Sequence, residues 1–194
     1  EEATIRPRTG EDKVDIVIQG REANRNEIQV GGGVSGLDGA FFSGSYATRN
    51  FLGRGEILQT YFQLGGRATR YSISFIEPWF LGRPYTAGFS LFKRTTEYAN
   101  FEQGGEGLSV QLGRLLGDFS RFDVTYLLED VTYTDSRNNV SRSTTSSIMP
   151  VYTYDTRNNF FRPTRGFRLQ LAAEYAGGAL GGSNYFFKSY SNET

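Results

Sequence analysis

The sequence predicts an all-β fold, an antiparallel up-and-down transmembrane β-barrel, and three observations predict it. Apolar and polar residues alternate through most of the chain, the predicted strands are long, and one turn phrase recurs. The phrase is Phe51-Leu52-Gly53, which returns as Phe80-Leu81-Gly82 and is echoed by Leu115-Leu116-Gly117. The phrases are 29 and then 35 residues apart, about the length of two strands with their connections. A chain that returns to the same edge after every two strands is a meander.

The composition excludes several classes of function. Lys and Arg number 21, and Asp and Glu also number 21. Zero net charge argues against nucleic-acid binding, which normally needs a basic excess. The chain has no Cys and no His, which removes disulfides, thiolate nucleophiles, imidazole bases and His-ligated metals. We therefore expect no enzyme, no catalytic residue, no cofactor and no metal site.

The hydropathy pattern indicates strands that are apolar on one side only. Aromatic residues make up 15% of the chain although its mean hydropathy is −0.45, a combination that outer-membrane barrels show. No window approaches 18 consecutive apolar residues, which excludes a transmembrane helix. Barrel-spanning strands need about 9–11 residues, and soluble strands average about 5–6.

About ten strands follow from the alternation, most of them eight to twelve residues long. The first begins at Glu27, where Ile28, Val30 and Gly32 share one face. We expect short connections at residues 35–39 and 65–70, and longer polar loops at 95–104 and 134–146. Further strands are predicted around residues 40–48, 55–64, 72–75, 85–91, 108–112, 122–129, 148–154 and 167–175, with a last one starting at Tyr185-Phe186-Phe187.

The two faces of these strands differ. Arg168, Gln170 and Glu174 share a face, as do Asp123 and Glu129 on another strand, and such charged faces suit a water-filled lumen. A soluble β-sandwich is the alternative, with each apolar face packed against a second sheet. The charged faces favour the barrel. The apolar face ends in aromatic residues, which we interpret as membrane-interface anchors: Phe51, Trp79, Phe80, Tyr85, Phe160 and Phe161.

Residues 1–25 do not follow this pattern. Residues 6–12 have the composition of a charged turn, and residues 13–19 predict one strand with Val14, Ile16 and Ile18 on one face. A single strand cannot bury such a face alone. We therefore expect the last strand of a domain whose remainder lies upstream, followed by a linker.

Several phrases resemble Omp85 proteins, in order and at plausible spacing. Residues 25–33 and 46–56 resemble the first two barrel strands and first periplasmic turn of that family. Residues 77–82 (Glu-Pro-Trp-Phe-Leu-Gly) are similar to its second turn. The most distinctive phrase is 155–166 (Asp-Thr-Arg-Asn-Asn-Phe-Phe-Arg-Pro-Thr-Arg-Gly), similar to the turn before its ninth strand. The resemblance covers about residues 12–188.

The resemblance implies a sixteen-stranded barrel preceded by periplasmic POTRA domains. Residues 1–25 would then be the C-terminal strand of a POTRA domain and its linker. Residues 26–194 would be the N-terminal part of the barrel, strands one to nine and the start of ten. The family's later luminal loop, with its Arg-Gly-Phe motif, has no counterpart, because Arg165-Gly166-Phe167 is a turn-to-strand junction.

The resemblance also implies a function in the bacterial outer membrane. It predicts an assembly component, or insertase, that inserts unfolded outer-membrane protein clients into the lipid bilayer, with accessory assembly lipoproteins as partners. The alternative is a polypeptide secretion or translocation pore of the same superfamily. A passive porin lacks a POTRA-like lead-in, and an outer-membrane hydrolase needs a Ser/His pair.

A client strand would pair with the exposed edge of the first barrel strand, so that its backbone groups are satisfied as it enters lipid. Three consecutive glycines in this strand would weaken closure of the barrel seam, or would mark a bend near the barrel rim; the sequence favours neither. The candidate edge is Glu27, Ile28, Gln29, Val30, Gly31, Gly32 and Gly33.

Overall fold

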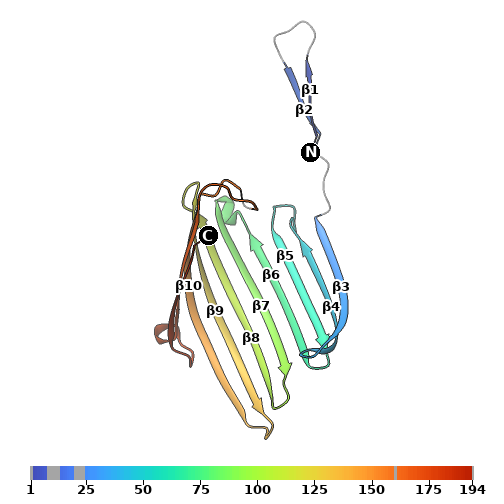
Figure 1. The fold of residues 1–194 in the computed structure, drawn as a ribbon, viewed down its shortest axis with the longest axis vertical. Coiled ribbons are helices and arrows are strands. Elements are labelled where there is room, and N and C mark those ends of the chain that lie inside the picture. Colours follow the sequence, from blue (N-terminus) through green and yellow to red (C-terminus); the bar gives the residue numbers. More distant parts are fainter. Residues whose placement is uncertain (1, 8–13, 20–24, 160, 194) are drawn as a thin grey trace.

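The fold is a single curved sheet of ten antiparallel strands, joined in chain order from β3 to β12 (Figure 1). The structure is a computed structural model that describes residues 2–7, 14–19, 25–159 and 161–193. Among these residues, no helix is long and apolar enough to cross a membrane. The strands are β3 (Asn26–Ser35), β4 (Gly39–Thr48), β5 (Ile57–Gly65), β6 (Ala68–Glu77), β7 (Tyr85–Glu97), β8 (Phe101–Leu115), β9 (Ser120–Asp135), β10 (Val140–Asp155), β11 (Arg168–Ala176) and β12 (Phe186–Glu193).

The predicted meander of about ten strands is confirmed. Each strand pairs with the next one along the chain, and in the described ranges no second sheet covers either face. The sandwich alternative is therefore excluded. The connections gather at two ends of the sheet. We call the end with residues 49–56, 78–84, 116–119 and 156–167 the turn end, and the end with residues 36–38, 66–67, 98–100, 136–139 and 177–185 the loop end.

The lead-in contains two strands, where the sequence predicted one. β1 (Glu2–Pro7) and β2 (Val14–Gln19) form an antiparallel hairpin whose register runs from Glu2↔Gln19 to Pro7↔Val14. Residues 6 and 7 therefore end a strand and do not belong to a turn. The strand escaped prediction because its pattern is short and ends in proline, a residue typical of strand termini. The assignment of residues 1–25 to a POTRA domain and linker stays a prediction.

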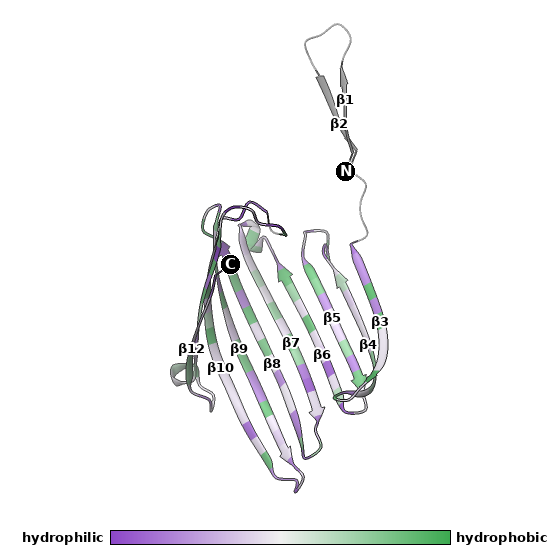
Figure 2. Ribbon diagram, in the orientation of Figure 1, coloured by the Kyte–Doolittle hydropathy of each residue, from purple (hydrophilic) through white to green (hydrophobic). Residues whose placement is uncertain are grey.

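Strand register separates the side chains into an apolar face and a polar face. Phe75 pairs with Phe89, Phe89 with Val110, and Val110 with Tyr126, so that large apolar residues continue from strand to strand on one face. On the opposite face, Ser74, Ser90 and Ser109 are paired in the same way. Figure 2 shows the alternation as green and purple stripes along the strands. The predicted lumen residues Asp123, Glu129, Arg168, Gln170 and Glu174 all lie on the polar face.

No second sheet among the described residues covers the apolar face. Ala68 and Ala176 are the only buried apolar residues in the described part of the chain. Large side chains in the middle of the apolar face stay open, such as Phe89 at 42% exposure and Leu112 at 54%. An apolar surface that spans a whole sheet is unstable in water and stable in hydrocarbon. The face therefore requires lipid, as in an outer-membrane barrel.

Four strands are longer than the sequence predicted. β7 to β10 have 13, 15, 16 and 16 residues, and the expected long loops at 95–104 and 134–146 are largely strand. Their register continues to Glu97↔Glu102 and to Val140↔Thr134, which leaves only residues 98–100 and 136–139 as connections. Past the apolar residues the apolar face becomes mostly polar, and the stacked rings of Phe101 and Tyr133 lie on the opposite face. The alternation that identifies a strand is therefore lost although the hydrogen-bonded ladder continues.

Candidate functional site

β3 is an edge of the ten-stranded sheet. Its one neighbour there is β4, with unbroken register from Asn26↔Thr48 to Ser35↔Gly39. Residues 26–34 are all exposed, with Ile28 at 73% and Val30 at 69%. An exposed strand edge offers unpaired N–H and C=O groups to an incoming strand. The seven candidate residues 27–33 all lie in this strand, as the sequence predicted for the first barrel strand.

The glycines of β3 lie in the regular part of the strand. None of Gly31, Gly32 and Gly33 has a positive φ, and the register with β4 shows no bulge. A Cβ at Gly32 would lie 3.1 Å from the carbonyl oxygen of Phe41. Backbone conformation therefore does not demand glycine at these positions. Their effect is to leave this stretch joined to β4 through its own backbone groups alone.

The predicted interface aromatics gather at the turn end. Phe51 lies in the β4–β5 turn, Trp79 and Phe80 in the β6–β7 turn, Tyr85 at the start of β7, and Phe161 in the β10–β11 turn. Phe160 lies outside the described residues. Trp79 is 59% exposed and Phe161 is 89% exposed. Three separate connections and the start of β7 thus present rings at one end of the apolar face, the distribution expected at a membrane–water interface.

We call the aromatic residues at the turn end the aromatic girdle, and the sequence did not predict all of its members. Phe119, which follows the Leu115-Leu116-Gly117 phrase, has its ring centroid 6.4 Å from that of Tyr154, and Tyr154 lies 5.6 Å from Phe167. The guanidinium of Arg114 lies 5.1 Å from the ring centroid of Tyr85, a cation–π distance. Phe119 could have been predicted as an interface residue, because it follows Gly117 of the third turn phrase by two residues.

The backbone conformation of the turns explains why the recurring phrase ends in glycine. Leu52 and Leu81 have φ values of 30° and 57°, and the glycines after them have φ of 81° and 69°. The Gly82 N–H donates to the carbonyl of Trp79 at 2.9 Å and closes the turn η1 (Phe80–Gly82). Left-handed conformations suit glycine and strain leucine. The phrase is therefore a tight turn that presents an exposed leucine beside its aromatic residue.

The first turn is held by two polar side chains. The Gly55 N–H donates to Asn50 Oδ1 at 2.7 Å, and the Arg54 N–H donates to Glu56 Oε2 at 3.0 Å. Glu56 is 2% exposed, and among the residues whose burial the structure describes it is the one buried charged residue. Both bonds satisfy backbone donors of the turn, so these residues have a structural role.

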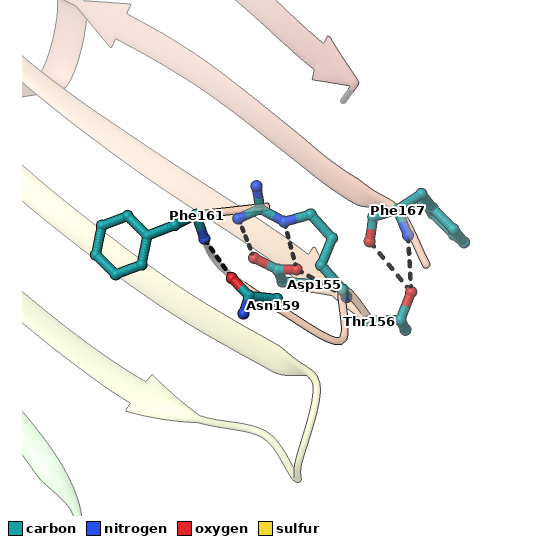
Figure 3. Close-up of polar contacts among 6 residues, drawn as sticks. Asp155, Thr156, Asn159, Phe161 and Phe167 are labelled. Carbon is teal, nitrogen blue, oxygen red and sulfur yellow. Dashed lines mark hydrogen bonds and ion pairs between the residues drawn. The ribbon is translucent and has the colours of Figure 1, made fainter. Parts of the chain in front are cut away.

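The distinctive phrase 155–166 is a compact turn between β10 and β11 (Figure 3). Arg157 donates two side-chain hydrogen bonds to Asp155, at 2.9 and 2.7 Å, and these bonds raise the pKa of Arg157. Asn159 Oδ1 accepts the Phe161 N–H at 2.8 Å, and the Thr156 hydroxyl both donates to and accepts from the backbone of Phe167. In Figure 3 the Phe161 ring points away from the Asp155 carboxylate. The polar residues shape the turn, which leaves the aromatic ring outside.

The polar face carries ion pairs between strands. Arg94 of β7 forms a salt bridge with Glu129 of β9 across the intervening β8. Gly105 of β8 leaves room for this pair, since a Cβ there would lie 3.2 Å from Glu129 Oε1 and 3.3 Å from Arg94 Nε. The described residues include no group of three or more His, Cys, Asp or Glu that could hold a metal ion. Arg94 and Glu129 lie on the polar face, where a water-filled lumen of a membrane barrel carries its charged residues.

Comparison with known proteins agrees with this geometry. The profile of the Omp85 superfamily domain matches residues 50–193, more than half of the chain. The outer membrane protein assembly factor BamA of Nitratidesulfovibrio vulgaris (strain Hildenborough) is 24% identical over 192 residues, which cover 94% of this chain and 24% of that protein. A Treponema pallidum (strain Nichols) protein provisionally described as an outer membrane protein assembly factor is 33% identical over 90 residues, covering 44% of this chain and 11% of that protein.

A solved structure has the same fold. The crystal structure of BamA from Haemophilus ducreyi lacking POTRA domains 1–3 aligns with a TM-score of 0.68 and 17% sequence identity, covering 99% of this chain and 41% of that chain. The chain thus spans about a quarter or less of the curated relatives that it matches. With its one-sided apolar sheet, and with a family profile that covers most of its length, this chain belongs to the Omp85 superfamily.

Proposed function

We propose that this chain is part of an outer-membrane β-barrel assembly factor, which folds and inserts client barrel proteins by pairing their strands with β3. The observation that carries the proposal is the exposed β3 edge at one side of a lipid-facing sheet. The relatives named as assembly factors support it. The protein lies in the bacterial outer membrane, and its partners are unfolded outer-membrane proteins and lipid. Accessory lipoproteins complete the proposed assembly.

The mechanism needs no cofactor and no enzymatic step. A client strand that enters hydrocarbon must satisfy its backbone N–H and C=O groups, because each unsatisfied group is several kcal/mol unfavourable. The open edge of β3 supplies complementary groups in the geometry of an antiparallel or parallel ladder. The choice of β3 rather than β12, the other edge of this sheet, rests on the family resemblance of residues 25–33.

The proposal assigns an orientation. The turn end, with its aromatic girdle, faces the periplasm, and the loop end faces the cell exterior. β3 then runs from the periplasmic side at Asn26 to the outer side at Ser35. Clients that arrive from the periplasm meet the Asn26 end of the edge first.

The substitution Gly32→Val tests the role of the edge. A β-branched residue stiffens a strand and favours the extended conformation, so β3 would adapt less well to a client. The new Cβ would lie 3.1 Å from the carbonyl oxygen of Phe41, which calls for a small local shift of β4. We expect slower client assembly in cells that express the full-length variant. Heat-modifiable gel migration would verify that the variant barrel itself is folded.

Gly104→Val is the matched control. Gly104 lies on the same face as Gly32, in β8, and a Cβ there would come no closer than 3.9 Å to another residue. Equal assembly rates in the two variants would count against a role for β3. If Gly32→Val instead impaired release of a polypeptide to the exterior and left barrel assembly intact, the secretion alternative would be supported.

A further inference from the structure

The loop between β3 and β4 is tied to strands beyond its own hairpin. Arg70 of β6 donates from Nη2 to Asp38 Oδ1 at 2.8 Å, an ion pair between residues 32 positions apart. The Arg67 N–H donates to the carbonyl of Asp38 at 3.1 Å, and Arg67 Nη1 donates to the carbonyl of Gly36 at 3.2 Å. Ser35 and Asp38 also bond to each other, which fixes the loop conformation. We call this group, residues Ser35, Gly36, Asp38, Arg67 and Arg70, the latch.

The latch continues into the polar face. Gln63 of β5, which is 4% exposed, accepts from Arg70 Nη1 at 3.0 Å and from the Tyr61 hydroxyl at 2.7 Å. The Asp38 side chain is 19% exposed, whereas the exposed Lys93–Glu106 pair of β7 and β8 has values of 63% and 61%. A charge-assisted bond that is shielded from water is stronger than one on the surface. The Asp38–Arg70–Gln63 part of the latch is therefore partly shielded, with Arg70 at 33% exposure, whereas the bond from Arg67 to Gly36 is exposed.

A glycine allows the loop to approach β5. A Cβ at Gly65 would lie 2.8 Å from the carbonyl oxygen of Ala68 and 3.0 Å from that of Asp38. A side chain at this position would push the β3–β4 loop away from the strand end. The Glu97 N–H in turn donates to the carbonyl of Arg67 at 2.7 Å, which joins β7 to the same cluster. Residues of β6 and of the β5–β6 connection thus bond to the β3–β4 loop, and β7 supports that connection.

The rest of β3 is exposed, from residue 26 to residue 34. Gly31, Gly32 and Gly33 contribute no side chains to contacts with β4. At the turn end the Tyr46 hydroxyl donates to Asn26 Oδ1 at 3.3 Å, a longer bond between exposed residues, and the Arg49 N–H donates to the carbonyl of Arg25 at 3.2 Å. The Ser35 end of β3 is therefore tied into the latch, whereas residues 26–34, which include the glycine run, are exposed.

We propose that the latch fixes the Ser35 end of β3, so that the strand moves at its Asn26 end with residues 31–33 as the hinge. Arg70 and Asp38 are then positioning residues for client pairing, an inference that rests on the proposed function. A client strand would first pair beside Asn26 and extend toward Ser35. With the Ser35 end fixed, each client residue would pair with a defined residue of β3. If the whole hairpin could slide, the register between the client strand and β3 would not be defined.

Distance measurements between spin labels test the latch without any client. The described chain contains no cysteine, which allows paired labels through Gly36→Cys with Asn100→Cys at the loop end, and Glu27→Cys with Arg54→Cys at the turn end. In full-length protein in lipid vesicles we expect a narrow distance distribution for the first pair and a broad one for the second. Equal widths would overturn the proposal.

Variants of the ion pair complete the test. Arg70→Gln should broaden the loop-end distribution, and the double substitution Asp38→Arg with Arg70→Asp should narrow it again. Lys93→Gln, which removes an ion pair of the same 2.8 Å length from β7 and β8, should leave it unchanged. An unchanged distribution in folded Arg70→Gln protein would refute the latch.

Client assembly then tests the positioning role. Assembly should slow in Arg70→Gln and recover in the charge-swapped double variant, while Lys93→Gln behaves as the parent. A broadened loop end with unaltered assembly would refute the positioning role. If the parent protein assembled no client at all, the proposed function would fail, and the distance measurements would still decide whether the latch exists.

Discussion

The substitution Val110→Arg should lower the free energy of unfolding from lipid by about 2–4 kcal/mol, the range for a cation at the midplane of a membrane barrel. Val110 lies on the apolar face of β8, paired with Phe89 on one side and Tyr126 on the other. The depth of Val110 in the membrane is inferred from two charged residues on the same face of β8, Glu106 and Arg114, which we place near the two membrane surfaces. Val110 is four residues from each of them.

The spacing of these charges matches a bilayer. Eight residues at about 3.4 Å each span roughly 27 Å along the strand, and a tilt of about 40° reduces this to roughly 21 Å across the membrane, near the ~25 Å height of the apolar band in such barrels. An arginine midway between the charges would have the longest path to water in either direction. Its side chain could not reach the interface without distorting the bilayer.

Ser109→Arg is the matched control, because Ser109 is adjacent in β8 and lies on the polar face. Urea titration of the full-length protein in vesicles would measure both variants. We expect a much smaller change for Ser109→Arg, since the lumen is hydrated. Similar losses for the two variants would contradict the assignment of the apolar face to lipid.

The second large effect is expected for Gly166→Ala, which should lower the free energy of unfolding by at least about 2 kcal/mol. Gly166 has φ of 89°, and a Cβ there would lie 2.2 Å from the carbonyl oxygen of Thr156. Left-handed strain costs about 1–2 kcal/mol, and overpacking against backbone adds about 1–3 kcal/mol. Two backbone segments of the β10–β11 turn meet at this point, so relaxation would disturb the start of β11.

Gly53→Ala separates the two causes. Gly53 has a similar φ of 81°, and a Cβ there would meet nothing within 4 Å. We expect this variant to lose only the conformational part, about 1–2 kcal/mol. The same urea titration measures both proteins, and equal losses would show that the contact with Thr156 contributes nothing.

The sequence predicted the part of the fold that lipid imposes. A strand with hydrocarbon on one face and water on the other must alternate, so the centres of most strands were recognisable, as at Ile28-Gln29-Val30 or Phe89-Ser90-Leu91. Of the last strand, β12, only the aromatic start was predicted. The turn end was also recognisable, because its glycines with positive φ and its aromatic residues recur at fixed places. Both signals are local in sequence.

Features that depend on distant pairs were not predictable. Thr95 and Gly104 are ladder partners, but neither strand alternates there, since water reaches both faces. Asp38 and Arg70 form an ion pair over 32 positions, and no local pattern connects them. The edge position of β3 was expected through family resemblance, whereas the shielded end that the latch gives it emerges only from the folded arrangement.

The extra length of β7 to β10 has a consequence for how the molecule meets its surroundings. Beyond Glu106, β8 continues for five residues toward its loop end, and its ladder with β7 continues with it. In the proposed orientation this part of the sheet extends beyond the lipid headgroups on the exterior side, as a polar extension of the barrel strands. Antibodies, phages and toxins that approach an intact cell would encounter fixed backbone there, with only the short connections at residues 98–100 and 136–139 free to vary in shape.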